Sequence, residues 1–147
     1  MLIPDINLLI YAYDETSPFH TPSKKWLSQL LNGQNEVGIP LVCILGFIRL
    51  VSNHKIFEQP LTPAAACEIT RSWLATPTAA LLEPGPRHLQ LLEKMLAGSH
   101  ATSALTTDCH IAALAVEHQG IIHSNDLDFK RFEGLRCVNP LSSESDL

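Results

Sequence analysis

The chain has 147 residues, of which 46% are hydrophobic and 17% charged, which suits one soluble globular domain rather than a disordered chain. Its net charge of −5 argues against broad, sequence-independent binding to nucleic acid, which usually requires a surplus of basic residues. Because no apolar stretch is long enough to span a bilayer, no secretory signal is present and the four cysteines form no CxxC pair, we expect a cytoplasmic protein with reduced thiols and no membrane association.

The first elements alternate between a strand and helices. Residues 2–4 (LIP) predict a short strand that leads into Asp5, and residues 7–13 (NLLIYAY) have a helix-like apolar content. The Thr-Pro pair at 21–22 is typical of a helix N-cap followed by proline in the first turn. The helix that it opens is expected to end before Gly33.

The middle of the chain repeats this pattern. Residues 36–39 (EVGI) predict a second strand, and residues 41–53 are apolar nearly all round, which predicts a buried helix. The Thr-Pro pair at 62–63 again predicts the start of a helix. Residues 78–84 (TAALLEP), bounded by prolines, predict a third strand.

Two more helices and two more strands are predicted in the last part of the chain. Pro86 opens a helix that ends at Gly98, and Thr106 or Thr107 is expected to cap a helix that ends before Gly120. The strands are predicted at residues 121–124 (IIHS) and 135–138 (LRCV). Alternation of strands and helices is typical of a mostly parallel sheet covered by helices on both faces, so the fold class is α/β. We expect one domain, residues 1–141, followed by a polar, frayed tail at residues 142–147.

Four aspartates are candidates for a shared site. Asp5 follows the first predicted strand, Asp126 and Asp128 follow the strand at 121–124, and Asp108 lies in the first turn of the helix before that strand. Ligands bind outside the carboxyl ends of the strands in open parallel sheets. We therefore expect these carboxylates to meet at one edge of the sheet.

Carboxylates crowded in this way require a proton or a cation. Two of them about 4 Å apart repel each other by about 4 kcal/mol at an effective dielectric constant of about 20. Mg²⁺ or Mn²⁺ takes oxygen ligands, retains several waters and needs only a few carboxylates. Such an ion can activate a water molecule and stabilise charge on a phosphoryl oxygen, which indicates phosphodiester hydrolysis.

Each candidate also has a purely structural explanation. Asp5 suits the N-cap of a helix, Asp108 is favourable for a helix dipole, and Asp126 and Asp128 are common turn residues. The neighbouring basic pair at 130–131, Lys130 and Arg131, is placed either to contact phosphate or simply to be solvated.

Three regions of the chain carry a characteristic pattern: DINLLIYAYDE near the start, FEQPLTPAAA in the middle, and TTDCHIAALAVEHQGIIHSNDLDFKRFEGL with the closing VNPL near the end. Together they resemble the PIN domain, and more narrowly the ribonuclease toxins of VapC type. The resemblance covers the chain from Asp5 to Leu141. It implies a three-layer α/β/α fold with a central sheet of about five strands and an endoribonuclease that depends on Mg²⁺ or Mn²⁺.

The resemblance also implies roles for individual residues. Asp5, Asp108 and Asp126 are expected to hold the metal, and Asp128 occupies the adjacent, often acidic position. The polar residues that match positions supporting the carboxylates by hydrogen bonds are Asn7 and Ser124. Such toxins usually form homodimers, and an antitoxin holds them inactive by covering the acidic site with its C-terminal segment.

One position departs from the pattern of many PIN domains. A glutamate usually lies in the helix after the second strand, shortly before an arginine, but here that position is Gly46, with Arg49 following. One ligand is therefore missing. We expect one well-bound ion, with any second ion supplied or completed by the substrate.

The leading hypothesis is a toxin endoribonuclease that cleaves structured cellular RNA at a single-stranded loop. The alternative, which Gly46 favours, is a non-catalytic PIN-like module that binds a basic partner through its acidic cluster. A Mn²⁺ titration distinguishes an occupied metal site, because a ligand that binds the folded state raises the melting temperature. An aspartyl phosphotransferase is a weaker alternative, because such enzymes have a second aspartate at the position that Asn7 occupies here.

Overall fold

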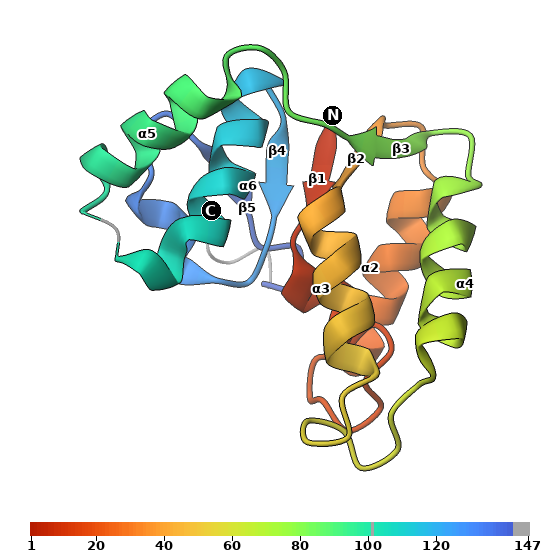
Figure 1. The fold of residues 1–147 in the computed structure, drawn as a ribbon. Helices are drawn as coiled ribbons and strands as arrows, with labels where there is room; N and C mark the ends of the chain where they lie inside the picture. The colour runs from red at the N-terminus through yellow and green to blue at the C-terminus, as the bar shows by residue number, and fades with distance from the viewer. Residues whose placement is uncertain (101, 143–147) are drawn as a thin grey trace.

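The computed structural model describes residues 1–100 and 102–142. Helices and strands alternate along the chain (Figure 1). In chain order they are β1 (Leu2–Pro4), α1 (Ile6–Tyr11), α2 (His20–Asn32), β2 (Val37–Pro40), α3 (Leu41–Val51), α4 (Pro63–Leu74), β3 (Ala79–Leu82), α5 (His88–Gly98), α6 (Thr106–Glu117), β4 (Ile121–His123) and β5 (Arg136–Val138). Short 3-10 helices, η1 (Ser103–Leu105) and η2 (Leu127–Arg131), precede α6 and β5.

The five strands form one sheet in the order β3-β2-β1-β4-β5, and every pair of neighbours is parallel. The register pairs Leu2 with Ile121 and Pro4 with His123. The predicted parallel sheet of five strands is thus confirmed. Because β1 lies between β2 and β4, the start of the chain is adjacent to its last third.

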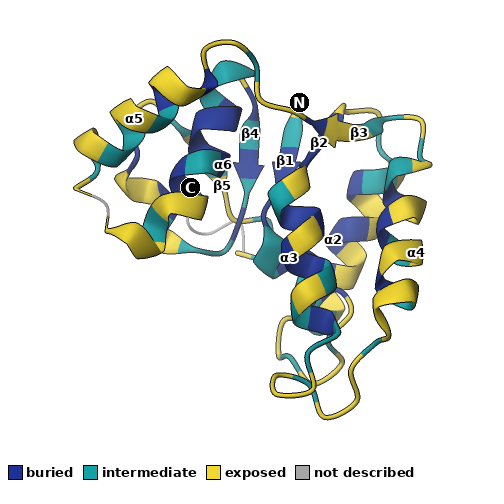
Figure 2. Ribbon diagram, viewed as in Figure 1, coloured by how far each residue is buried: buried dark blue, intermediate teal, exposed yellow. Residues whose placement is uncertain are grey.

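Helices cover both faces of this sheet, so the predicted three-layer α/β/α fold is confirmed (Figure 1). The strands β1, β2 and β4 are mostly buried, and α6 is buried along most of its length, whereas α3, α4 and α5 expose their outer sides (Figure 2). The central strands contribute fully buried aliphatic side chains such as Ile3, Ile39 and Ile122. Strands buried on both faces explain why these segments read as short apolar runs.

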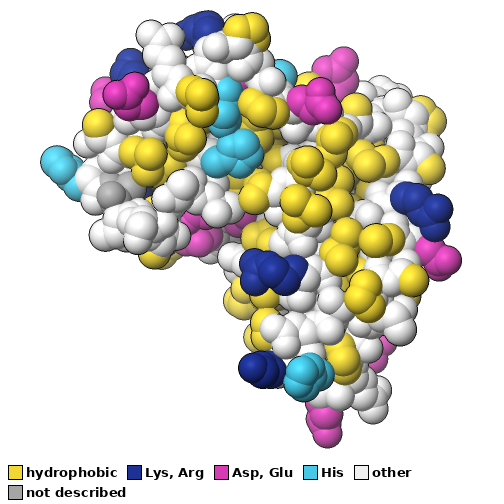
Figure 3. Space-filling model, in the orientation of Figure 1, with side chains coloured by type: hydrophobic (Ala, Val, Ile, Leu, Met, Phe, Trp, Pro, Cys, Tyr) yellow, Lys and Arg dark blue, Asp and Glu magenta, His cyan; other side chains and the backbone are white. Residues whose placement is uncertain are grey.

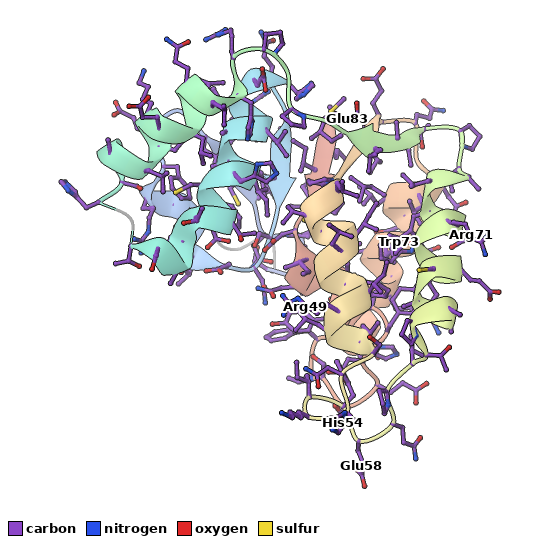
Figure 4. All side chains as sticks on the ribbon, viewed as in Figure 1. Arg49, His54, Glu58, Arg71, Trp73 and Glu83 are labelled. Carbon is purple, nitrogen blue, oxygen red and sulfur yellow. The ribbon has the colours of Figure 1, made fainter. Side chains whose placement is uncertain are left out.

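An aromatic cluster joins α3 and α4 to the chain after α1. The ring centroids of Phe47 and Trp73 are 4.8 Å apart, and that of Tyr13 is 5.5 Å from Phe47. The indole Nε1 of Trp73 donates a hydrogen bond to the Tyr13 hydroxyl at 3.1 Å. Figure 4 shows Trp73 between α3 and α4. Phe47 and Trp73 are buried, so their rings belong to the core of this half of the molecule.

The predicted helix starts are partly wrong. The Thr62 cap is confirmed, because its hydroxyl accepts a hydrogen bond from the Ala65 amide at 3.1 Å. However, α2 begins at His20, so the Thr-Pro pair at 21–22 lies inside its first turn. Likewise, α6 continues directly from η1 and begins at Thr106, with Leu105 at the N-cap position. In both cases a turn leads directly into the helix, and the N-cap residue makes no side-chain hydrogen bond.

The helix predicted to be apolar all round is buried on one side only. Leu41, Leu45 and Arg49 are exposed and lie four residues apart, so they form one outer stripe along α3. Figure 4 shows Arg49 projecting from this helix. The exposed leucines of this stripe therefore remain available for contact with another molecule.

Most of the predicted tail, residues 143–147, lies outside the described residues, while the hydroxyl of Ser142 donates to the Asn139 carbonyl at 2.8 Å. All four cysteines lie in the described part and none is in a disulfide. In residues 1–100 and 102–142, no helix combines the length and the apolar character that crossing a membrane requires.

Candidate metal centre

The carboxyl ends of β1 and β4 lie beside each other. The amide of Asp5 donates to the His123 carbonyl at 2.9 Å, so the chain leaving β1 remains in contact with the end of β4. Asp5 then turns into α1, while β4 continues through Ser124 toward η2. Two segments remote in sequence therefore present acids at one edge of the sheet, as the position of ligands in parallel sheets requires.

Asp5 is a buried carboxylate with both oxygens engaged. It is only 2% exposed, its Oδ1 accepts a hydrogen bond from the Ile6 amide at 2.8 Å, and its Oδ2 accepts one from the Ser124 hydroxyl at 2.7 Å. Burial raises the pKa of Asp5, these two hydrogen bonds lower it, and the charge of Asp126 raises it further. Asp5 is thus both the N-cap of α1 and part of the acidic site.

Ser124 connects Asp5 to the segment after β4. It is 2% exposed, and its hydroxyl donates to Asp5 while accepting a hydrogen bond from the Asp126 amide at 2.9 Å. One hydroxyl therefore uses its donor and an acceptor lone pair to fix both segments. The position of Asp126 relative to Asp5 depends on this single side chain.

The turn into η2 orients the last two acids. Oδ1 of Asp126 accepts a hydrogen bond from the Asp128 amide at 2.8 Å, which caps η2. Nη2 of Arg131, one turn later, donates to Oδ1 of Asp128 at 2.9 Å. Alternate residues of this tight turn thereby point to the same side.

Three carboxylates converge closely enough to hold one ion. One oxygen from each of Asp108, Asp126 and Asp128 lies within 4.8 Å of the other two, and all three residues are half-buried. Asp108 comes from the first turn of α6, and the other two come from the turn into η2. Asp5, which the sequence places among the metal ligands, is not a member of this closest set, but its charge acts on Asp108.

The pKa of Asp108 is raised from 3.8 to about 6. Burial is the largest cause, the charges of Asp5, Asp126 and Asp128 add to it, and the charge of Arg131 lowers the pKa. Such a carboxyl group is only half ionised at a pH of about 6, and a positive charge beside it favours the ionised form. The oxygen-only donor set and the uncompensated repulsion both fit a hard divalent cation such as Mg²⁺ or Mn²⁺.

The other predicted site residues are placed less closely. Asn7 is half-buried in the first turn of α1, and among the described residues its side chain makes no hydrogen bond to these carboxylates. Arg131 is ion-paired with Asp128, while Lys130 is exposed beside it. Of these two cations, Arg131 contacts one of the acids, whereas Lys130 forms no ion pair with them in the described part of the chain.

Gly46 is explained by the packing of α3 on α1. It is buried, and a Cβ atom at this position would collide with Cδ1 of Ile6. The space that a glutamate side chain would occupy at this position is filled by Ile6, the residue directly after Asp5. The acidic site is therefore built without a contribution from α3.

Two features near the site go beyond what the sequence predicts. Asp128 is one of the three converging acids, and the signal for it was its spacing of two from Asp126 in a tight turn. The Trp26 indole donates to Nδ1 of His123 at 3.0 Å, which anchors the end of β4 to α2. No local pattern predicts this pair, because its members are 97 positions apart.

Known proteins are similar to this chain over nearly its whole length. The PIN domain family matches residues 2–135. Ribonuclease VapC37 of Mycobacterium tuberculosis is 44% identical over 95% of this chain and 97% of its own length, and ribonuclease VapC33 of the same species is 38% identical over 96% and 99%. The VapC ribonuclease Mb2897 of Mycobacterium bovis is 33% identical over the full length of both chains.

Solved structures share the fold at low sequence identity. VapBC2 from Rickettsia felis, bound to a DNA fragment from its promoter, has a TM-score of 0.67 at 16% identity, over 94% of this chain and 97% of that one. VapBC-1 from nontypeable Haemophilus influenzae has a TM-score of 0.66 at 14% identity, over 96% and 98%. With the family matched over nearly all of its length and with full-length relatives at this level of identity, the chain belongs to the PIN domain family, among the VapC ribonucleases.

Proposed function

We propose that this protein is a metal-dependent endoribonuclease, the toxin of a toxin–antitoxin pair, which cleaves structured cellular RNA at a single-stranded loop in the cytoplasm. The observation that carries the proposal is the convergence of Asp108, Asp126 and Asp128 within 4.8 Å at the carboxyl edge of a parallel sheet. Full-length relatives named VapC ribonucleases support the same activity.

The three converging carboxylates are the proposed ligands of one Mg²⁺ or Mn²⁺ ion. When bound, such an ion supplies a Lewis acid that makes water more acidic and stabilises charge on a phosphoryl oxygen. A bound ion is expected to lower the pKa of Asp108, because its positive charge offsets the burial and the neighbouring carboxylates that raise this pKa. With Ile6 filling the space beside Gly46, α3 adds no carboxylate, so we propose one well-held ion in the free protein.

Asp5 has a different proposed role from the other three acids. Its two oxygens accept hydrogen bonds from Ile6 and Ser124, and its buried charge lies beside Asp108 and Asp126. In this position we propose that it completes the negative field of the site and orients the attacking water. Arg131 is placed to exchange its ion pair with Asp128 for a substrate phosphate.

We further propose two protein partners. An antitoxin is expected to cover the acidic edge, in keeping with structural neighbours that were solved as VapBC. A second copy of the chain is expected on the apolar face, where Leu41 and Leu45 of α3 and Leu89 of α5 are 49%, 58% and 77% exposed. Figure 3 shows hydrophobic side chains gathered over α3 and continuing toward α5 and α6. A patch of this kind is typical of a protein–protein interface.

The proposed activity is tested by RNA cleavage with matched acid variants. Purified protein is incubated with total cellular RNA and Mn²⁺, and Asp108→Asn is compared with Glu68→Gln, which removes an exposed acid on α4. We expect cleavage by the wild type and by Glu68→Gln, loss of about a hundredfold or more in Asp108→Asn, and no cleavage in EDTA. Equal activity of Asp108→Asn, or activity that persists in EDTA, would contradict the proposal.

A further inference from the structure

A cavity lies between α5 and the chain that follows η2. Its volume is about 430 Å³, which is within the range of about 300–1,000 Å³ common for ligand pockets. Its apolar walls include Leu91 and Met95 from α5 and Phe132 from the end of η2. Leu91 and Phe132 are also packed in the interior, so these walls are held by the core.

Charged side chains surround the apolar walls. Lys94 lies on α5, and Arg131 and Glu133 come from the opposite side, and all three are exposed. Two cations therefore line this cavity in a protein whose net charge is −5. An apolar interior with cations at its edge suits a ligand that is flat and apolar at one end and anionic at the other.

Arg131 connects the cavity to the metal centre. Its side chain lines the cavity, while its Nη2 is 2.9 Å from Oδ1 of Asp128. The same charge also acts on the carboxyl group of Asp108. A ligand in the cavity whose anionic end contacts Arg131 would therefore lie close to Asp128.

We propose that this cavity is a nucleobase subsite, which holds one base of single-stranded RNA beside the phosphodiester bond that is cleaved. This inference rests on the proposed ribonuclease function. Bases of single-stranded RNA are splayed out and bound against apolar or aromatic side chains, while cations contact the phosphates. Lys94 and Arg131 are the phosphate contacts, and the base lies between α5 and Phe132.

Glu133 is the residue that would select the base. It is an acceptor in a cavity whose other charged residues, Lys94 and Arg131, are donors. A carboxylate accepts hydrogen bonds from the N–H groups on a base edge, so it favours bases that present such donors. The sequence selectivity of the enzyme is then set at a distance from the ions and acids that perform the hydrolysis.

Gly98 offers a way to fill the cavity. It is the last residue of α5, it lines the cavity, and a Cβ atom built on it meets no other atom within 4 Å. Gly98→Phe therefore adds a ring to a residue of the cavity lining, with no clash at its Cβ atom. Ala97→Phe is the matched control, because this exposed neighbour on the same helix is not part of the cavity lining.

The test uses fluorescence anisotropy with a labelled eight-nucleotide RNA of mixed sequence and its fully abasic counterpart, which has the same charge. Ca²⁺ fills the acidic site during the titrations, and the RNA is checked for integrity on a gel. We expect the wild type and Ala97→Phe to bind the base-bearing RNA about tenfold more tightly than the abasic strand. Gly98→Phe should bind both strands equally while keeping the melting temperature of the wild type.

A second pair of variants tests the phosphate contact. Lys94→Gln should weaken binding of both strands equally and reduce the slope of log affinity against log salt by about 0.7. Lys25→Gln, which removes an exposed lysine on α2, should leave the slope unchanged. An unchanged slope in Lys94→Gln would overturn the assignment of this residue.

The outcomes separate this inference from the proposed function. If the wild type cleaves RNA in Mn²⁺ but shows no base preference, or if Gly98→Phe retains that preference, the subsite is refuted and ribonuclease activity stands. A cavity that serves a peptide instead of a base would give this result. If the wild type neither binds nor cleaves RNA, the ribonuclease proposal fails and the subsite fails with it.

Discussion

At the scale of single residues, the Ser124 hydroxyl links the carboxylate of Asp5 to the backbone of Asp126. It bonds to Asp5 and to the Asp126 amide at once, and it is buried where water cannot replace it. Removing it leaves a buried carboxylate oxygen and an amide without their partner. The stability of the fold and the geometry of the site therefore depend on the same atom.

We predict that Ser124→Ala lowers the free energy of unfolding by about 1–3 kcal/mol, the usual cost of leaving buried polar groups unsatisfied. It should also weaken Mn²⁺ binding, because Asp126 is no longer held in place. Urea unfolding and isothermal titration calorimetry measure the two effects. Ser72→Ala, which removes an exposed serine of α4, is the control and should change neither.

The raised pKa of Asp108 predicts how stability depends on pH. Its carboxyl group titrates near 3.8 when unfolded and at about 6 when folded, so the folded state binds this proton more tightly. The stabilisation is present below 3.8 and is lost as pH rises to about 6. In EDTA, the melting temperature of the wild type should therefore fall relative to that of Asp108→Asn across this interval.

Mn²⁺ provides the complementary measurement. At neutral pH it should raise the melting temperature of the wild type, because the ion binds the folded state, and it should raise that of Asp108→Asn much less. Parallel pH curves for the two proteins in EDTA would contradict the electrostatic account. Equal shifts with Mn²⁺ would contradict the assignment of Asp108 as a ligand.

The sequence identified the acids but not their exact grouping. Strand ends followed by aspartates predicted that Asp5, Asp108 and Asp126 share one edge, because strand direction is a property of the whole sheet. Which oxygens lie nearest depends on the turn into η2, where Asp126 accepts from the Asp128 amide and turns Asp128 toward Asp108. Such local turn geometry is set by hydrogen bonds that spacing alone does not specify.

At the scale of elements, the contact between α1 and α3 depends on Gly46. The absence of a side chain there leaves room for Ile6, which extends from the start of α1 immediately after Asp5. The position of Asp5 is therefore coupled to a helix that supplies no ligand. This coupling can be measured with side chains of graded size.

We predict that Gly46→Ala destabilises the protein by about 1 kcal/mol, because the added methyl group displaces Cδ1 of Ile6. Ile6→Val removes that atom, so the double variant should recover most of the loss in urea unfolding. Gly98→Ala in α5 is the control, since its Cβ meets nothing within 4 Å, and it should cause no loss. Additive effects of the two substitutions would show that Ile6 is not the obstacle.

Element types were predictable, whereas several helix starts were not. The strands and the helix at 63–74 follow from local apolar runs and from the Thr62 cap. The Thr-Pro pair does not predict the start of α2, because the turn before it already leads into the helix. Phe19 occupies the N-cap position without a side-chain hydrogen bond. A Thr-Pro pair shows where a side-chain cap is available. The backbone before the helix determines whether the helix begins at that cap.

At the scale of the whole molecule, the exposed stripe of α3 predicts self-association. Leu45, which is 58% exposed, lies near the middle of this stripe. Leu45→Glu should convert a dimer into a monomer in sedimentation equilibrium, because a charge would be buried in an apolar interface. Ile56→Glu, in the loop after α3, should leave the dimer intact. A wild type that sediments as a monomer would contradict the proposed dimer.

The sheet order also bears on how the chain is made in the cell. β1 stands between β2 and β4, so a nascent chain on the ribosome that has emerged only through α5 carries Asp5 but none of its three acidic partners. The acidic site is complete only when β4 and η2 have folded beside β1. The proposed ribonuclease activity therefore requires that residues 106–131 have been made and have folded beside the first strand.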